Sequence, residues 1–299
     1  MTAKPTLDAF LDKHRLPSVF TESAERCYLP CADWLHRQIA DHQGDGLTDA
    51  FVLGINGAQG TGKSTLADLL ATVLGEQHGY RIVVLSIDDL YKTKAEREAM
   101  ARDVHPMFAT RGVPGTHDVE LGIRTIDALH ALKQGETLRV PRFDKSVDDR
   151  YPASNWTEVT GPIDAVIFEG WCVGSRAAED AALLEPVNAL EAERDADGSW
   201  RRTVNTALAS DYRRLFALLD RLVLLRAPDF DCVHRWRLEQ EHKLRDAAGD
   251  AAGVMTDAEV ATFIEYYERI TRDNLMRLED WANVVIELAD DHSAVSFRA

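Results

Sequence analysis

A chain of 299 residues with 45% hydrophobic content is long enough to form one large domain or two small ones. Its formal net charge of -16 at pH 7, spread along the chain, argues against binding to nucleic-acid phosphates or anionic lipid. Apolar runs are too short to span a membrane, residues 1–15 lack the apolar core of a signal peptide, and four scattered cysteines are typical of a reducing compartment, so we predict a cytoplasmic protein.

Residues 1–48 precede the first apolar strand pattern. A helical, amphipathic pattern runs through about 24–39, and the turn-forming sequence QGDG follows at 43–46. We therefore predict an N-terminal helical extension that packs on the core.

From about residue 50 onward, short apolar runs alternate with longer segments of helical period. The predicted strands are residues 51–55, 81–86, 163–168, 221–225 and 283–288. The predicted helices are residues 63–78, 118–133, 203–219, 230–245 and 257–274, the last opened by a capping box from Thr256 to Glu259. This alternation predicts an α/β fold in which helices cover both faces of an open, parallel sheet.

The most specific motif directly follows the first predicted strand. It has the form GxxxxGK[ST], and the predicted nucleotide-binding residues are Gly57, Ala58, Gln59, Gly60, Thr61, Gly62, Lys63, Ser64 and Thr65. Glycines allow successive backbone N–H groups to turn toward a phosphate at the positive end of a helix. We expect Lys63 to reach the β- and γ-phosphates of ATP as a catalytic residue and Ser64 to offer its hydroxyl to Mg²⁺.

The second predicted strand ends in the sequence LSIDDLY, which places Asp88 and Asp89 beside the expected phosphate site. Phosphoryl transfer to a hydroxyl group needs an acceptor that positions that hydroxyl and takes its proton. Asp88 is our candidate for this role and a candidate metal ligand, and Tyr91 is a candidate substrate contact. For Asp89 the alternative is a cap of the next turn. The chain has neither the Asn-Lys-x-Asp motif of GTPases nor the Leu-Ser-Gly-Gly signature of transporters.

Loops between residues 105 and 150 contain the cations available to a carboxylated substrate. The candidate substrate contacts there are Arg111, His117, Arg142 and Lys145. Each has an ordinary alternative: a solvated surface position for the arginines and the lysine, and the start of a helix for His117.

The third predicted strand ends in the sequence FEGW. Glu169 at its end is the predicted second metal ligand, and Trp171 is a candidate substrate contact. Beyond it we predict a helical insertion over about residues 175–215, with a solvated surface loop at 190–198.

A predicted helix after the fourth strand carries Arg235 and Arg237, candidates for a lid that closes over the transferring phosphoryl group. The two side chains cannot share one helix face, so at most one acts there. The alternative is a charged helix surface.

Taken together, GAQGTGKST, LSIDDLYKT, RGVPGTHDVELG, VPRFDKS and VIFEGW resemble the plant-type D-glycerate 3-kinases and their fungal and bacterial relatives, within the phosphoribulokinase and uridine kinase superfamily. The resemblance spans about residues 50–290. It implies a P-loop kinase domain at 49–299 that uses ATP and Mg²⁺, with Asp88 as the base and D-glycerate or a similar sugar acid as the acceptor. A nucleoside or pantothenate-like acceptor and a non-catalytic ATP-sensing role remain alternatives. Oligomeric state is left open.

Overall fold

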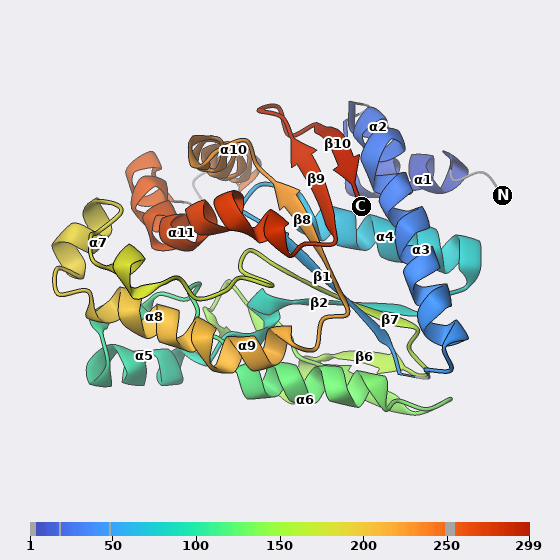
Figure 1. Ribbon diagram of the computed structural model, residues 1–299, viewed down its shortest axis with the longest axis horizontal. Helices are drawn as coiled ribbons and strands as arrows, with labels where there is room; N and C mark the ends of the chain where they lie inside the picture. Colours follow the sequence, from blue (N-terminus) through green and yellow to red (C-terminus); the bar gives the residue numbers. More distant parts are fainter. Residues whose placement is uncertain (1–3, 18, 48, 249–254) are drawn as a thin grey trace.

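The computed structural model describes residues 4–17, 19–47, 49–248 and 255–299. Within these residues a six-stranded sheet has the order β10-β9-β8-β1-β7-β2, and β10 alone runs antiparallel to its neighbour (Figure 1). The strands are β1 Phe51–Gly57, β2 Ile82–Ser86, β7 Ala165–Gly170, β8 Arg221–Arg226, β9 Val284–Leu288 and β10 Ala294–Arg298. The predicted α/β class and parallel sheet are confirmed; β10 was not predicted.

Both faces of the central strands are buried, which explains their continuous apolar sequences. Along β1, Leu53 and Ile55 belong to the core on one face, whereas Val52 belongs to the core on the other. Helices α1 Lys4–His14, α3 Leu29–Gly44 and α4 Lys63–His78 contribute to the first core, and α6 Val119–His130, α8 Ser199–Ala209 and α9 Asp211–Phe216 to the second (Figure 1). Helices α10 Phe230–Ala248 and α11 Asp257–Arg277 pack against each other.

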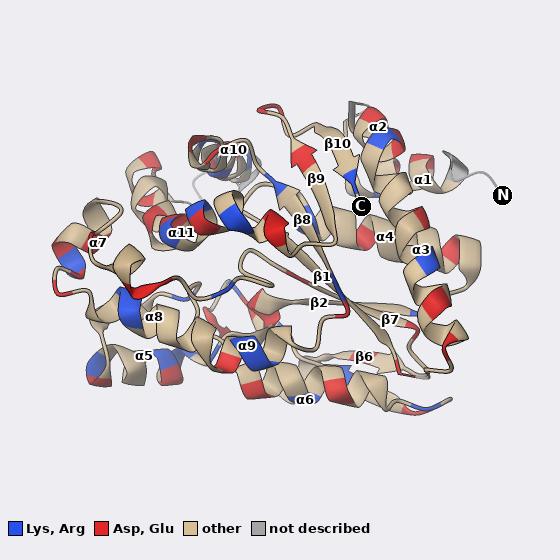
Figure 2. Cartoon of the chain, in the orientation of Figure 1, with Lys and Arg blue, Asp and Glu red and all other residues tan. Residues whose placement is uncertain are grey.

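Besides several 3₁₀ turns, the remaining helical elements are α2 Val19–Ser23, a π-helical turn at Ala24–Tyr28, α5 Lys94–Asp103 and α7 Ala189–Arg194. Two small antiparallel pairs complete the described structure: β3 Thr137–Val140 with β6 Thr157–Thr160, and β4 Phe143–Asp144 with β5 Asp149–Arg150. Acidic and basic residues are interspersed along the outer helices (Figure 2). Among the described helices, none combines the length and apolar character needed to span a membrane.

The N-terminal helices pack directly on the sheet domain. Leu7, Cys27 and Leu35 are fully buried in the same core as α4. Ser23 Oγ also accepts a hydrogen bond of 2.9 Å from the backbone N–H of Ala294 at the start of β10. The division of the chain into an extension at 1–48 and a kinase domain at 49–299 stays a prediction.

Two local predictions were wrong. The helix predicted at 203–219 is broken at Ser210, whose hydroxyl hydrogen-bonds back to the Thr206 carbonyl and whose backbone leaves helical geometry. The solvated loop predicted at 190–198 instead contains α7 and two buried carboxylates, Glu191 and Asp195. Charged residues usually indicate a solvated segment, but here Glu191 forms an ion pair with Arg269 of α11 and Asp195 forms one with Arg201 of α8.

Asp195 shows how such a buried carboxylate is held. Its side chain accepts hydrogen bonds from the backbone N–H groups of Trp200 and Arg201 at the start of α8, and forms an ion pair of 3.0 Å with the buried Arg201 guanidinium. The group therefore stabilises the helix start and compensates a buried positive charge.

We predict that Asp195→Ala lowers the free energy of unfolding by about 3–5 kcal/mol, because it leaves the Arg201 charge buried and unpaired. Urea unfolding followed by circular dichroism measures this loss. Glu158→Ala is the control, since Glu158 and its partner Arg139 are both exposed and 3.7 Å apart. Equal effects of the two substitutions would contradict the prediction.

Candidate active site

The phosphate-loop motif lies at the carboxyl end of β1 and leads into α4, as the sequence predicts. Gly60 and Gly62 have φ of 84° and 81°, and Gly62 is the N-cap of α4. Thr61 Oγ1 donates a hydrogen bond of 2.8 Å to the Ala58 carbonyl and fixes the turn. The loop thus has the left-handed glycine geometry that turns backbone N–H groups toward an anion at a helix N-terminus.

Two side chains far along the chain brace this loop. A Cβ atom on Gly60 would lie 2.6 Å from Cβ of Trp236, which is fully buried on α10. His292, in the turn between β9 and β10, hydrogen-bonds through Nδ1 to the Gly60 carbonyl at 3.1 Å and stacks on the Trp236 ring. The shape of the phosphate loop therefore depends on α10 and on the C-terminal hairpin.

Ser64 and Glu169 meet across the gap between α4 and β7. Ser64 Oγ donates a hydrogen bond of 3.0 Å to Glu169 Oε1, while the buried Oε2 has no partner among the described residues. Burial raises the pKa of Glu169, and the nearby Lys63 charge opposes that shift only in part. A buried carboxylate oxygen without a donor, next to a hydroxyl, fits a Mg²⁺ ligand set.

The protein alone does not form a complete metal cage here. In the described ranges of the chain no group of three or more His, Cys, Asp or Glu side chains is arranged to hold a metal ion. Mg²⁺ commonly takes one or two protein ligands and completes its shell with water and substrate phosphates, and the Ser64–Glu169 pair has that form.

Asp88 lies in the 3₁₀ turn Ile87–Leu90, immediately after β2. Its carboxylate accepts hydrogen bonds from Tyr91 Oη at 2.8 Å and from Lys145 Nζ at 2.6 Å. Burial by itself would raise the pKa of Asp88, but the charge and hydrogen bond of Lys145, the charge of Lys63 and the bond from Tyr91 together lower this pKa to about 2. The group is therefore a carboxylate at neutral pH.

Asp89 has a structural partner. It forms an ion pair of 2.6 Å with Arg142 and accepts a hydrogen bond from the Phe143 backbone N–H. These contacts fasten the β4–β5 hairpin, which carries Lys145, next to Asp88. Asp89 and Arg142 thus hold the hairpin in place.

The candidate acceptor site has a buried aromatic and imidazole wall. His117 stacks on Tyr91 at 4.5 Å between ring centroids and hydrogen-bonds through Nδ1 to Tyr212 Oη. Burial lowers the pKa of His117 to about 3, so the ring is neutral, and its Nε2 has no partner among the described residues. Trp171 packs edge-on against Tyr267 and donates its indole N–H to the Gly112 carbonyl at 3.0 Å.

Arg111 is the best placed cation for an anionic acceptor. It forms an ion pair with Asp148 through one terminal nitrogen, and its guanidinium carbon lies 5.6 Å from the Phe143 ring centroid. Its charge also opposes the rise in the pKa of Tyr91 and of Tyr267 that burial causes, so it is close to both phenols. Asp148 has a second partner, the buried Arg97, at 2.9 Å.

The two lid candidates point in different directions. Arg237 forms an ion pair of 2.6 Å with Glu241, lies over the Phe263 ring and is mostly buried on the side of Tyr267. Arg235 is half-exposed and contacts Cys232 Sγ and Asp290, near the β9–β10 turn. Of the two, Arg237 lies near Tyr267 and Arg235 does not, and the lid role stays a prediction.

Sequence reasoning missed four residues that shape this site. They come from α5, α9, α11 and the C-terminal turn: Arg97, Tyr212, Tyr267 and His292. Most of their contacts connect positions separated by about a hundred residues or more, and no local pattern marks them.

The chain is similar to several known kinases. No family model matches the chain. It is 37% identical over 228 residues to an uncharacterized kinase of Schizosaccharomyces pombe, covering 73% of this chain and 78% of that one. It is 32% identical over 253 residues to the chloroplastic D-glycerate 3-kinase of Arabidopsis thaliana, covering 80% of this chain but only 52% of that enzyme. A solved structure of D-glycerate 3-kinase from Cryptococcus neoformans has a TM-score of 0.75 and 26% identity, with 91% of this chain and 98% of that one covered.

We predict that Gly60→Ala weakens nucleotide binding about tenfold to a hundredfold, because the added Cβ displaces the loop from Trp236. Isothermal titration with an ATP analogue measures the affinity. Gly79→Ala is the matched control: Gly79 also has a left-handed φ, of 73°, but a Cβ there would meet nothing within 4 Å. Both variants carry the same kind of backbone strain, and nucleotide affinity that falls equally in both would rule out the specific role of the contact.

Proposed function

This chain belongs to the P-loop kinase family that includes the D-glycerate 3-kinases, and on that premise we propose that it transfers the γ-phosphoryl group of ATP to a hydroxyl group of D-glycerate. The observation that carries the proposal is the position of Asp88, which is an ionised carboxylate beside the charge of Lys63 and within the Tyr91, His117 and Arg111 cluster. A phosphate site and a hydroxyl-binding carboxylate thus lie next to each other.

In the proposed reaction, Asp88 accepts a hydrogen bond from the acceptor hydroxyl and receives its proton as the new bond between that oxygen and the γ-phosphorus forms. The bond from the γ-phosphorus to the β,γ-bridging oxygen breaks, and ADP leaves with the electron pair. The backbone of residues 57–65 holds the phosphates, and Lys63 and Arg237 stabilise charge on the transferring oxygens. Mg²⁺, held by Ser64 and Glu169, supplies charge neutralisation on the phosphates when it is bound.

A carboxylated acceptor is supported by the charge arrangement around Asp88. Arg142 donates hydrogen bonds through Nη1 to Asp89 and through Nε to Thr157, and Lys145 donates one to Asp88. Arg111 contacts Asp148 through one nitrogen, and Asp148 also has Arg97 as a partner. A substrate carboxylate is therefore able to replace Asp148 at Arg111 without leaving Asp148 unpaired.

The cellular location of the protein and the identity of its acceptor remain proposals. The four cysteines are free and buried, which is consistent with the reducing, cytoplasmic location predicted from the sequence. The chain spans about half the length of the plant relative, so substrate identity rests on the experiments below.

The direct test is ADP release by the purified protein with MgATP and a panel of acceptors: D-glycerate, glycerol, other sugar acids, uridine and pantothenate. We expect D-glycerate to stimulate turnover and glycerol, which has the hydroxyls without the carboxylate, to do so poorly. Turnover disappears in Lys63→Ala and Asp88→Asn, while Asp88→Asn still binds ATP. Stimulation by uridine or pantothenate and not by any sugar acid would replace the proposed acceptor.

We predict that Arg111→Met raises the KM for D-glycerate about tenfold to a hundredfold with little change in kcat, the loss expected for one charge-assisted contact to a carboxylate. Asp148 keeps its ion pair with Arg97 in this variant, so the fold is preserved. Arg139→Met, which removes an exposed arginine of β3, serves as the control for charge. An unchanged KM would exclude Arg111 from the acceptor site.

A further inference from the structure

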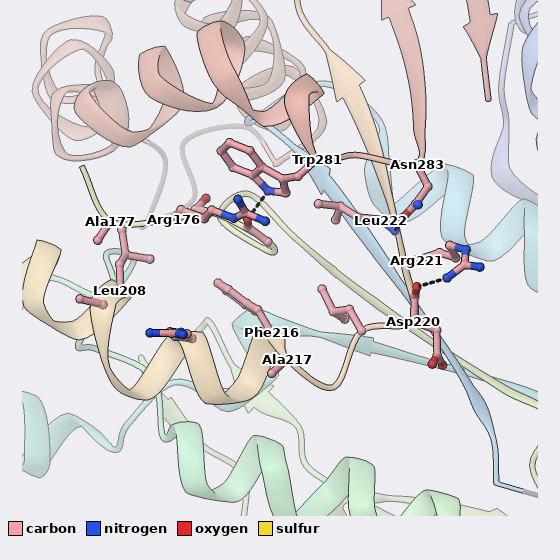
Figure 3. Close-up of a pocket in the computed structure, with 15 residues that line it drawn as sticks. Arg176, Ala177, Leu208, Phe216, Ala217, Asp220, Arg221, Leu222, Trp281 and Asn283 are labelled. Atoms are coloured by element: carbon pink, nitrogen blue, oxygen red, sulfur yellow. Dashed lines mark hydrogen bonds between the residues drawn. The ribbon is translucent and has the colours of Figure 1, made fainter. Parts of the chain in front are cut away.

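A cavity of about 720 Å³ lies away from the phosphate loop. It is bounded by the segment after β7, by α8 and α9, and by the residues that enter β8 and β9 (Figure 3). Asp220, Arg221 and Leu222 line it at the amino-terminal end of β8, and Trp281 and Asn283 line it just before β9. Its volume is in the range of cavities that bind small molecules.

This cavity is separate from the proposed active site. Strand β8 runs parallel to β1, and the phosphate loop follows the carboxyl end of β1, so the start of β8 is at the opposite end of the sheet. The lining contains neither Lys63, Asp88, Glu169 nor any of the candidate substrate contacts.

Three arginines line the cavity, Arg176, Arg213 and Arg221, and give it a positive character. Arg221 donates hydrogen bonds to Gln38 Oε1 and to the Asp220 carbonyl, which leaves Arg176 and Arg213 as the candidate anion contacts. The Arg176 guanidinium stacks 4.2 Å from the Trp281 ring centroid, and Trp281 donates its indole N–H to the Gly174 carbonyl at 3.0 Å. A stacked guanidinium keeps the N–H groups at its edge free for an anion. Across the described part of the chain, neither Arg176 nor Arg213 forms an ion pair.

The only lining carboxylate, among the residues the structure describes, is already engaged. Asp220 accepts a hydrogen bond of 2.7 Å from the Val52 backbone N–H. The lining thus carries the charges of Arg176, Arg213 and Arg221 against the single carboxylate of Asp220, although the chain as a whole has a net charge of -16. The guanidinium donors are suited to a carboxylate or phosphate.

The rest of the wall is apolar. Leu208, Phe216, Ala217 and Leu222 supply aliphatic and aromatic surface beside the Trp281 indole (Figure 3). We propose that this cavity binds an amphipathic organic anion, a small molecule that carries a carboxylate or phosphate group on a flat apolar body. The apolar body packs between Phe216 and Leu222, and the anionic group meets Arg176 and Arg213.

The cavity is connected to the active site by one short segment. After Glu169 the chain turns back along the sheet, so that Trp171 faces the acceptor site while Gly174 and Arg176 line the cavity. Asn274 on α11 ties the segment together, since it contacts both the Ser175 hydroxyl at 2.9 Å and the Trp171 carbonyl at 3.4 Å. This connection is the basis for the expectation that a ligand bound at Arg176 changes the binding of the acceptor.

The binding test uses the fluorescent probe anilinonaphthalene sulfonate and its uncharged analogue phenylnaphthylamine, titrated into the 299-residue protein. We expect the sulfonate probe to bind at one site, and to bind about tenfold or more weakly to the double variant Arg176→Met, Arg213→Met. Arg214→Met removes an exposed arginine of α9 that lies next to Arg213 in the sequence but outside the cavity, and we expect it to leave binding of the sulfonate probe unchanged. The uncharged probe binds all variants equally and so reports that the cavity is intact.

Equal binding of the sulfonate probe to all variants, or its displacement by saturating MgADP, would overturn the proposed site. If the site is present, we expect benzoate and phenyl phosphate to compete with the bound probe, and the stronger competitor identifies the preferred anion. Failure of both to compete would also overturn the proposal. None of these measurements needs turnover, so they stand apart from the proposed kinase reaction.

The coupling is tested by kinetics and rests on the proposed function. With the cavity saturated by the sulfonate probe, we expect the acceptor KM to change more than kcat, and the change to be absent in the double variant. An unchanged KM with an occupied cavity would overturn the coupling and leave a binding site without an effect on the acceptor.

Discussion

The site depends on the parallel register of three strands. In that register Ile55 of β1, Glu169 of β7 and Ser86 of β2 stand side by side, because β7 pairs with both of its neighbours. The carboxyl ends of all three strands therefore meet at one edge of the sheet, the usual place for ligands in open α/β folds. The phosphate loop, Glu169 and Asp88 are neighbours for this reason, although more than a hundred residues separate the first from the second.

Charge balance is the second constraint. Four cations of the loops around Asp88 are paired with carboxylates: Lys145 with Asp88, Arg142 with Asp89, and Arg97 and Arg111 with Asp148. In a strongly acidic chain these pairs fix loops that would otherwise repel one another, and they hold the hairpin of β4 and β5 beside the site. The candidate site is therefore organised by these pairs without a bound substrate.

Packing between residues far apart in the sequence fixes the shape of the loops around the candidate site. Trp236 and His292 set the phosphate loop through Gly60, and Tyr212 and Tyr267 set the loops that carry His117 and Arg111. The segment Trp171–Arg176 has contacts on both sides, with the acceptor site and with the cavity beside β8. The fold thus offers a short physical route between two candidate ligand sites.

The sequence by itself determined the sheet class, the phosphate loop and the identity of Asp88 and Glu169 as strand-end carboxylates. These follow from local rules: apolar runs of strand length, glycine positions, and polar residues directly after strands. The capping box at Thr256 and the bounds of α4 were likewise readable and are confirmed. The tertiary structure decided the rest: that Arg142 pairs with Asp89, that Asp195 is buried, and that α10 braces the phosphate loop. Such facts depend on which distant side chain fills a space or balances a charge, and a side chain's partner is not encoded in its neighbours along the chain.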